Sequence, residues 1–150
     1  MKLYETMTDL LRDARDKDRH IRFIDGENDE SQLTFAQLWE RASAMLGALQ
    51  ARGMQRGDEL VIFSTSNESF VIAFWAAILG GIVPVPVAVG ISDEHRFKLF
   101  RIIGQLRRGT LFTESALLER LVEFAKAKEL DDVVAILENK TVLMGDVNPA

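Results

Sequence analysis

The chain has 150 residues, of which 47% are hydrophobic and 27% are charged, and its formal net charge is −5 at pH 7. These values suit one folded domain with a hydrophobic core and argue against disorder. The 18 Lys and Arg against 23 Asp and Glu argue against a nucleic-acid partner, since such binders carry a basic excess. With no Cys and two His, the sequence excludes a disulfide scaffold, a cysteine zinc site and a thiol nucleophile.

Residues 69–92 carry no charge, which raises the question of a membrane span. Residues 70–79 are almost wholly apolar, but Gly80-Gly81, Pro84 and Pro86 interrupt the second half of the stretch. The uninterrupted helix of about ten residues is too short to cross roughly 30 Å of hydrocarbon. The stretch therefore predicts a buried helix and a buried strand, and no membrane span. The N-terminus lacks an apolar secretory segment, so we expect a soluble, cytoplasmic protein.

The first third of the chain predicts a helix, a hairpin and a second helix. Apolar residues at helical spacing predict an amphipathic helix over residues 3–14, and Asp25-Gly26 is a turn signal for a small hairpin. Thr34 and Gln37 have the spacing of a capping box, which predicts that the second helix begins there, and Gly53 is placed to end it. The second helix carries one apolar stripe: Phe35, Leu38, Trp39, Ala42, Met45, Leu46 and Leu49.

From residue 60 onward, apolar runs and helical patterns alternate. The unbroken apolar run at residues 60–63 is typical of a strand that is covered on both faces. The helix at 70–79 follows, Gly80-Gly81 is interpreted as a helix stop with close backbone packing, and residues 82–89 predict a second strand.

Ser92 is then expected to cap a helix with acidic residues in its first turn and Arg107 and Arg108 in its last, ending at Gly109. Further strands are predicted at 110–113 and 133–137, with a helix from Ser115 between them and a weaker strand at 141–144. Strands and helices in this order predict an α/β fold, a parallel sheet of βαβ units with helices on both sides. A helix and a small hairpin precede it.

The turn Ser64-Thr65-Ser66-Asn67 follows the first predicted core strand, at the sheet edge where α/β proteins bind ligands. Thr65 and Glu68 also have capping-box spacing, so both helix capping and ligand contact remain open for this turn. His20 lies in a run of charged residues, and His95 lies in a first helical turn with no nucleophile spaced to meet it. We expect neither histidine to be a catalytic base.

Five cations make one predicted helix basic: Arg96, Lys98, Arg101, Arg107 and Arg108. Such a helix is either a solvated face or a docking site for an acidic protein. The acidic pairs Asp131-Asp132 and Asp93-Glu94 are interpreted as helix caps and solvated loop residues, and no metal-ligand cluster appears. The residues alone therefore predict no catalytic, cofactor-binding or metal site.

Several segments resemble the opening motifs of the adenylate-forming superfamily, which includes acyl-CoA synthetases, fatty-acyl-AMP ligases and nonribosomal peptide synthetase adenylation domains. Leu33-Thr34-Phe35-Ala36-Gln37-Leu38 is similar to Leu-Thr-Tyr-x-Glu-Leu, and Gly57-Asp58-Glu59-Leu60-Val61 resembles the Gly-Asp-x-Val segment. Asn67, Phe70 and Ala73 match Asn-x-x-Phe-x-x-Ala.

Two later segments continue the resemblance, which covers residues 1 to about 137. Residues 77–86 are similar to Leu-Lys-Ala-Gly-Ala-x-x-Val-Pro, although Gly80 stands where Ala is usual and the typical Lys or Tyr is absent. Residues 100–115 look like a family helix, glycine and strand that end in Thr-Asp/Glu-Ser. The hairpin and the run at 83–86 resemble the fatty-acyl-AMP ligase branch more than the others.

The resemblance implies that the full enzyme joins a fatty or amino acid to AMP, releases pyrophosphate, and passes the acyl group to a phosphopantetheine thiol. ATP and Mg are its expected cofactors, and a carrier protein or coenzyme A is its expected acceptor. Residues 1–150 are then the N-terminal part of the adenylation domain, ending about where the family's phosphate loop would follow. No family catalytic residue falls on this chain, so we expect it to bind no cofactor and to be inactive alone.

Two expectations about partners follow. The helix at 70–79 is apolar all round, so the remaining subdomains are expected to cover it, and the isolated chain is expected to form homo-oligomers through exposed apolar surface. The alternative is a non-catalytic α/β interaction module that docks an acidic carrier or partner domain through the basic helix at 96–108.

Overall fold

A four-stranded parallel sheet forms the middle of the molecule. The computed structural model describes residues 3–24, 26–27, 30–90 and 92–147. The strands are β3 (Glu59–Phe63), β4 (Val83–Pro86), β5 (Gly109–Thr113) and β6 (Thr141–Leu143), in the order β4-β3-β5-β6. All three neighbouring pairs are parallel, and Val61 lies between Val85 and Leu111. The predicted α/β class and parallel pairing are confirmed.

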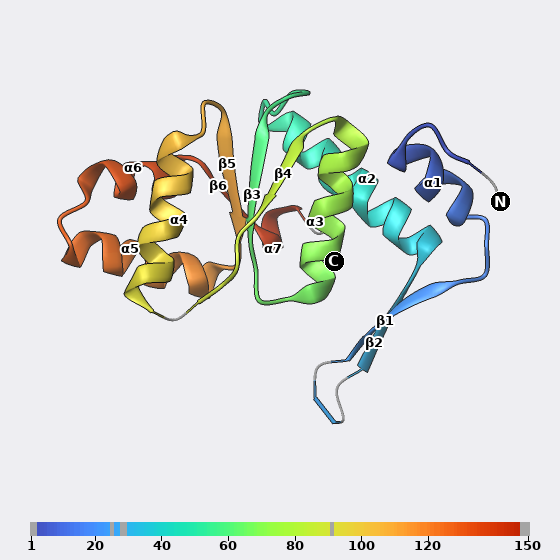
Figure 1. Ribbon diagram of the computed structural model, residues 1–150, viewed down its shortest axis with the longest axis horizontal. Coiled ribbons are helices and arrows are strands. Elements are labelled where there is room, and N and C mark those ends of the chain that lie inside the picture. Colours follow the sequence, from blue (N-terminus) through green and yellow to red (C-terminus); the bar gives the residue numbers. More distant parts are fainter. Residues whose placement is uncertain (1–2, 25, 28–29, 91, 148–150) are drawn as a thin grey trace.

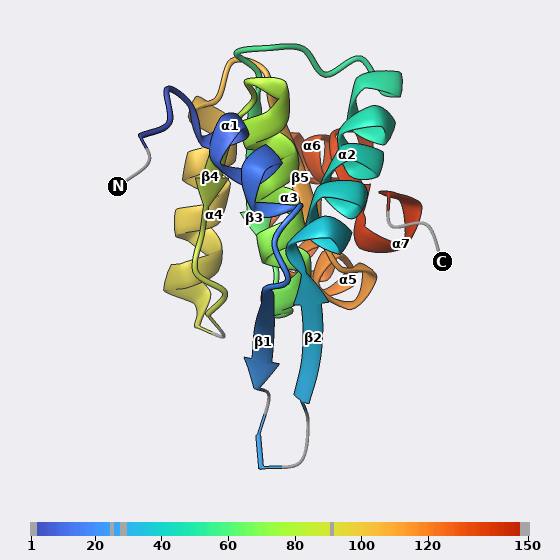
Figure 2. The same cartoon turned by 90° about the vertical axis from the view of Figure 1, so that its right-hand side faces the viewer.

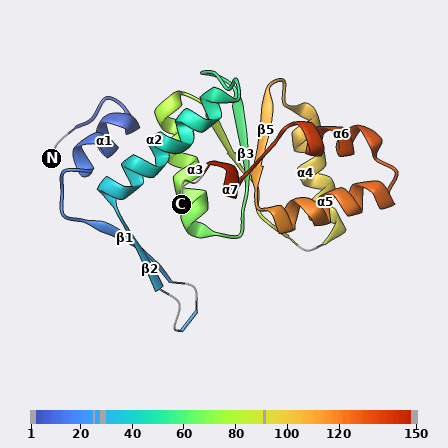
Figure 3. The same cartoon turned by 180° about the vertical axis from the view of Figure 1, so that it is seen from behind.

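Helices cover both faces of the sheet (Figures 1 and 3). On one face lie α2 (Phe35–Ala51), α3 (Asn67–Gly80) and the short α7 (Met144–Val147), and on the other lie α4 (Asp93–Gln105), α5 (Ser115–Ala127) and α6 (Asp131–Asn139). Successive side chains of β3 point to opposite faces, so Leu60 and Ile62 join the core under α2 and α3. Val61 and Phe63 join the core under α4 and α5. The predicted strand that is covered on both faces is confirmed.

The N-terminal segment lies against α2 and α3 and extends past one edge of the sheet. The hairpin of β1 (His20–Ile24) and β2 (Glu30–Thr34) is antiparallel, as predicted, and projects beyond the rest of the molecule (Figure 2). Helix α1 (Met7–Ala14) is shorter than the predicted helix, and Leu3 lies before it with 82% of its surface exposed. Asp25 of the predicted turn lies outside the described residues.

The capping box at the start of α2 is confirmed. The Gln37 backbone N–H donates to Thr34 Oγ1 over 3.0 Å, and the Thr34 N–H donates to Gln37 Oε1 over 2.9 Å. Leu33 and Leu38 on either side of this cap are fully buried, as expected of a hydrophobic staple. Gly53 has a φ of 93°, which fits its predicted role just past the end of the helix.

Some of the predicted strands differ from those in the structure. The strand predicted at 133–137 is helix α6, because Val133, Val134 and Leu137 share a helix face and the acidic pair at 131–132 favours a helix N-terminus. The fourth strand is instead β6, within the weaker strand predicted at 141–144. The strand predicted at 82–89 is the shorter β4.

Helix α4 also ends earlier than predicted. Leu106 adopts an extended backbone with ψ of 135°, so the helix stops at Gln105. Arg107 and Arg108 therefore lie in the connection to β5 and not in the last helical turn, and Gly109 is the first residue of β5. The cap at the helix start is as predicted, with Ser92 accepting from the His95 N–H over 3.3 Å.

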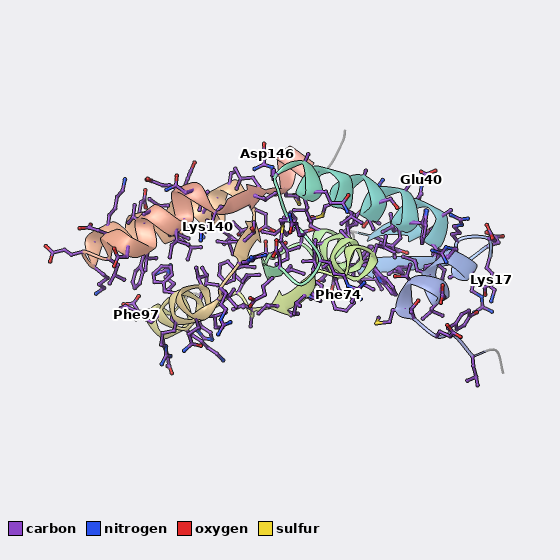
Figure 4. All side chains as sticks on the ribbon, turned by 90° about the horizontal axis from the view of Figure 1, so that it is seen from above. Lys17, Glu40, Phe74, Phe97, Lys140 and Asp146 are labelled. Carbon is purple, nitrogen blue, oxygen red and sulfur yellow. The ribbon has the colours of Figure 1, made fainter. Side chains whose placement is uncertain are left out.

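The apolar helix α3 packs on the sheet and α2 through its small residues. Ala73, Ala76 and Ala77 are fully buried, whereas the larger residues on its outer side are half-buried: Phe70, Val71, Phe74, Trp75, Ile78 and Leu79. Figure 4 labels Phe74 on this side of the helix. Within the part of the chain that the structure describes, no helix is long and apolar enough to cross a membrane.

The close packing at the end of α3 gives a stability test. Gly81 has a φ of 66°, and a Cβ there would lie 2.8 Å from Arg56 Cγ. Gly81→Ala is expected to lower the free energy of unfolding by about 1–2 kcal/mol because the left-handed backbone disfavours a Cβ. Gly47→Ala is the matched control, since a Cβ there has no neighbour within 4 Å. In urea denaturation it should raise stability by about 0.5–1 kcal/mol, and equal effects would contradict the assignment.

Candidate functional site

The carboxyl ends of the parallel strands meet at one edge of the sheet, where α/β proteins bind ligands. The turn at 64–66 follows β3, Glu114 follows β5, and Met144 follows β6. Ser69, near the start of α3, donates its hydroxyl hydrogen to Met144 Sδ, which ties the β6 end to this helix. The carboxyl edge is therefore the candidate site that the fold itself assembles.

One carboxylate oxygen of Glu114 holds the turn that follows β3. Glu114 Oε1 accepts from Ser64 Oγ at 2.5 Å, from the Thr65 N–H at 3.0 Å and from the Ser66 N–H at 3.3 Å. Thr65 Oγ1 lies 3.4 Å from the same oxygen. Hydrogen bonds to a charged group are stronger than neutral ones, so this set fixes the β3 turn to the end of β5.

The structure shows whether the turn at 64–67 caps a helix or is free to contact a ligand. Thr65 does not cap α3; Ser66 is the cap residue, and its Oγ accepts from the Ser69 N–H at 3.2 Å. The turn therefore caps α3, as one of the two interpretations expects, but through Ser66 and not through a Thr65–Glu68 capping box. Glu68 instead pairs with Arg41 at 2.7 Å. The backbone N–H groups of Thr65 and Ser66 do contact an anion, but this anion is the Glu114 carboxylate of the same chain.

The second oxygen of Glu114 is left without a donor. Glu114 Oε2 and Thr113 Oγ1 are both buried and make no hydrogen bond in the described structure. Glu114 stands at the cap position of α5, yet its side chain makes no cap hydrogen bond. A buried acceptor without a donor costs stability. Glu114 thus acts as a link between strands and not as a helix cap.

Beside the turn lies a cavity of about 120 Å³. Phe63, Leu117, Leu121 and Val89 form its apolar wall, and Thr65, Gly90, Arg96 and Arg120 complete the lining. Small-molecule sites usually have volumes of about 300–1,000 Å³. This cavity is thus too small for a nucleotide, although it has room for a small polar group.

The fit of ATP to the carboxyl edge depends on which hydrogen-bond donors are free there. The backbone donors of the turn, which would suit a phosphate, already bind Glu114. Among the described residues no three His, Cys, Asp or Glu are grouped to hold a metal ion. The N–H groups of Thr65 and Ser66 are therefore not free to bind a phosphate.

The predicted candidates elsewhere do not form a reactive group. His20 is exposed on β1, and His95 is exposed on α4, where its Nδ1 lies 2.5 Å from Ser92 Oγ at the helix cap. Asp131 and Asp132 occupy the first turn of α6, where a strand was predicted to follow them, and they make no side-chain cap bond. These residues serve helix starts or solvent-exposed faces.

The basic helix is less basic than the sequence suggests. Arg96 lies 3.5 Å from Asp93 and stacks 5.0 Å from the Phe124 ring centre, so its charge is partly used within the protein. Lys98 and Arg101 are exposed on α4, whereas Arg107 and Arg108 follow it. The five predicted cations are therefore divided between two parts of the surface.

The comparisons with known proteins agree with this architecture. Residues 10–149 match the family model described as AMP-binding enzyme. The chain belongs to the AMP-binding enzyme family. It is 28% identical over 125 residues to a putative fatty-acid–CoA ligase, fadD21, of Mycobacterium leprae, covering 81% of this chain and 21% of that protein. It is 21% identical over 130 residues to the long-chain-fatty-acid–AMP ligase FadD26 of Mycobacterium marinum, covering 84% of this chain and 22% of that protein.

Solved structures show the same fold. McyG A-PCP complexed with phenylalanyl-adenylate superposes with a TM-score of 0.84 at 21% identity, over 100% of this chain and 27% of that one. A fatty acid AMP ligase from Legionella pneumophila superposes with a TM-score of 0.72 at 20% identity, over 78% of this chain and 21% of that one. The chain thus spans about a fifth of the length of the curated relatives it matches.

Within this family fold, the Thr-Glu-Ser segment at 113–115 contributes the residue that sequence reasoning missed. The segment was recognised as a motif, but the role of Glu114 depends on β3 and β5 being neighbours, which the sequence does not state. The available signal was its position directly after a predicted strand of the same sheet as the 64–67 turn. Parallel neighbours place their carboxyl ends together, so Glu114 and the turn had to meet.

The Glu114 link is testable by substitution. Glu114→Ala is expected to lower the free energy of unfolding by about 1.5–3 kcal/mol, because two backbone N–H groups and a hydroxyl lose a charged acceptor. The amides of Thr65 and Ser66 should then exchange with solvent faster. Glu119→Ala is the control, because Glu119 is also a glutamate but is exposed on α5. It should change the free energy of unfolding by less than about 0.5 kcal/mol. Unchanged exchange at both amides would contradict the link.

Proposed function

We propose that this chain is the N-terminal scaffold of an ATP-dependent ligase that activates a carboxylic acid as an acyl-adenylate. The family match over residues 10–149 carries the proposal, since it covers all the core elements of the described fold except part of α1. The acyl group is then passed to a phosphopantetheine thiol. In this arrangement the sheet and its two helical layers position the edges on which the rest of the enzyme builds its site.

The relatives support a carboxylic acid as the substrate without selecting one. The two sequence relatives are named as fatty-acid ligases, whereas an adenylation domain of a keto acid-selecting module, bound to a keto acyl adenylate, superposes with a TM-score of 0.81 at 25% identity. Both groups act on an acid. We therefore propose the activation chemistry and leave the acyl chain to experiment.

The geometry of the carboxyl edge supports a nucleotide site outside this chain. The carboxyl edge has a cavity of about 120 Å³ and a turn whose donors are already bound to Glu114. We propose that the ATP molecule that reacts and its Mg bind to parts of the full-length enzyme outside these 150 residues, in the cytoplasm. We also propose that a carrier protein or coenzyme A accepts the acyl group. The remaining subdomains are the proposed partner of this chain.

The outer side of α3 is the surface that we propose those subdomains cover. Its aromatic residues are only half-buried, with Phe70 stacked 6.4 Å from Phe74 and Phe74 edge-on to Trp75 at 6.1 Å. On the neighbouring helix α1, Met7 and Leu10 are 45% and 42% exposed. Contiguous apolar surface of this kind marks an interface. In the isolated chain the same surface favours self-association, so homo-oligomers remain part of the proposal.

The coding sequence after residue 150 tests the proposal directly. We expect a loop rich in Gly, Ser and Thr that ends in Lys to follow soon after, because the family grips the ATP phosphates with such a segment. A stop codon there would contradict the ligase function. It would instead favour the interaction module, with the basic residues of α4 as its docking surface.

An assay of the 150-residue chain tests whether the nucleotide site lies outside it. Incubated with ATP, Mg and a panel of fatty, keto and amino acids, the chain should show no exchange of labelled pyrophosphate into ATP. The matched control is a complete fatty-acid–AMP ligase, measured in the same assay. Exchange by the purified chain above the rate without acid would contradict the proposal that the nucleotide site lies elsewhere.

A further inference from the structure

We propose a second ligand site, at the amino edge of the sheet, that binds a small molecule carrying two or more phosphate groups. This site lies at the opposite end of the strands from the carboxyl edge, and it does not rest on the proposed ligase function. The observation that carries it is a basic cavity of about 550 Å³ between the starts of β5 and β6 and the end of α2.

Four cations line this cavity and one acid opposes them. The basic residues are Arg52, Arg107, Arg108 and Lys140. The acid is Asp58, which is 8% exposed and already accepts the Gln55 N–H at 2.8 Å. The chain as a whole carries a net charge of −5, so this local excess of positive charge is not a general property of the surface.

Most of this positive charge is not neutralised within the protein. Arg108 Nη1 lies 3.9 Å from Asp58 Oδ1 and its side chain is 75% exposed, which is a weak pair. Arg52 lies 3.5 Å from Asp146, also at the surface. Arg107 and Lys140 make no ion pair with any residue that the structure describes. Figure 4 looks onto this edge, with Lys140 and Asp146 labelled.

The backbone beneath these cations is held by the sheet. The Arg108 carbonyl accepts the Glu59 N–H at 3.0 Å, and the Lys140 carbonyl accepts the Leu111 N–H at 2.9 Å. The two side chains therefore start from fixed points directly before two neighbouring strands, β5 and β6. Polar groups suited to phosphate oxygens complete the lining: Gln55, Thr110, Asn139 and Thr141.

The shape and charge of the cavity favour a small polyanion. Its volume falls within the range of small-molecule sites, about 300–1,000 Å³. Guanidinium and ammonium groups together are the usual phosphate ligands, and four of them match a ligand with several phosphates better than a single carboxylate. A concave site of this size suits a compact ligand more than an acidic protein surface.

Titration of the 150-residue chain with inorganic tripolyphosphate, followed by amide NMR shifts, tests the site. We expect saturable binding with shifts at residues 53–58, 107–110 and 139–142, weakening as salt is raised. The double variant Arg107→Gln/Lys140→Gln should bind at least about tenfold more weakly, since it removes the two unpaired cations. The control Lys98→Gln/Arg101→Gln removes the same charge from exposed positions on α4 and should bind within about twofold of the wild type.

ATP in place of tripolyphosphate distinguishes the two sources of the phosphate chain. Equal affinities would show recognition of the phosphates alone, and tighter ATP binding, with the same loss in the double variant, would show a nucleotide ligand; both support the site. Shifts that never saturate, or an equal loss in the control variant, would overturn it. Binding of polyglutamate in preference to tripolyphosphate would also overturn it, in favour of an acidic polypeptide partner.

Discussion

The structure depends on the burial of one strand, β3, between two helical layers. Its last four residues are at most 2% exposed, and it pairs with β4 on one side and β5 on the other. Its alternate side chains supply the centres of both hydrophobic cores. Removing apolar surface from water is the dominant favourable term in folding, and a strand covered on both faces contributes to it twice. The carboxyl edge and the amino edge of the sheet lie at the two ends of this buried strand and its neighbours.

The two edges differ in chemistry because different residues end and begin the strands. At the carboxyl edge Glu114 fills the anion-binding turn and leaves a small cavity, so the edge is closed by the chain itself. At the amino edge the connections before β5 and β6 carry Arg107, Arg108 and Lys140 into a larger cavity. The carboxyl edge is thus closed by contacts within the chain, whereas the amino edge is open and positively charged. The established membership in the AMP-binding enzyme family explains the scaffold but assigns no role to the second.

Local patterns predicted the elements whose residues report on their own surroundings. The Thr34–Gln37 capping box, the Gly53 and Gly81 stops and the apolar run of β3 all act within a few residues, and each is confirmed. Helix α6 was missed because a short run of β-branched residues fits a buried strand or a helix equally well. Its length and the acidic pair at its start favour the helix, which leaves β6 as the fourth strand.

Contacts between distant segments could not be predicted from the sequence. The Glu114 link and the amino-edge cavity both arise from strand order, since β5 lies between β3 and β6. The sequence predicts that strands pair in parallel, but it does not say which are neighbours. It also placed Arg107 and Arg108 on a helix, where they would have strengthened a docking face. Their actual position before β5 turns the same charges into part of a cavity.

Native-state hydrogen exchange of the 150-residue chain tests the central role of β3 most directly. Amides of residues 60–63 should be the slowest to exchange, with protection equal to the free energy of global unfolding measured in urea. Amides of the projecting hairpin, residues 20–24 and 30–34, should exchange orders of magnitude faster. If the β3 amides exchange as rapidly as those of the hairpin, the two helical layers do not close over this strand, and the account is wrong.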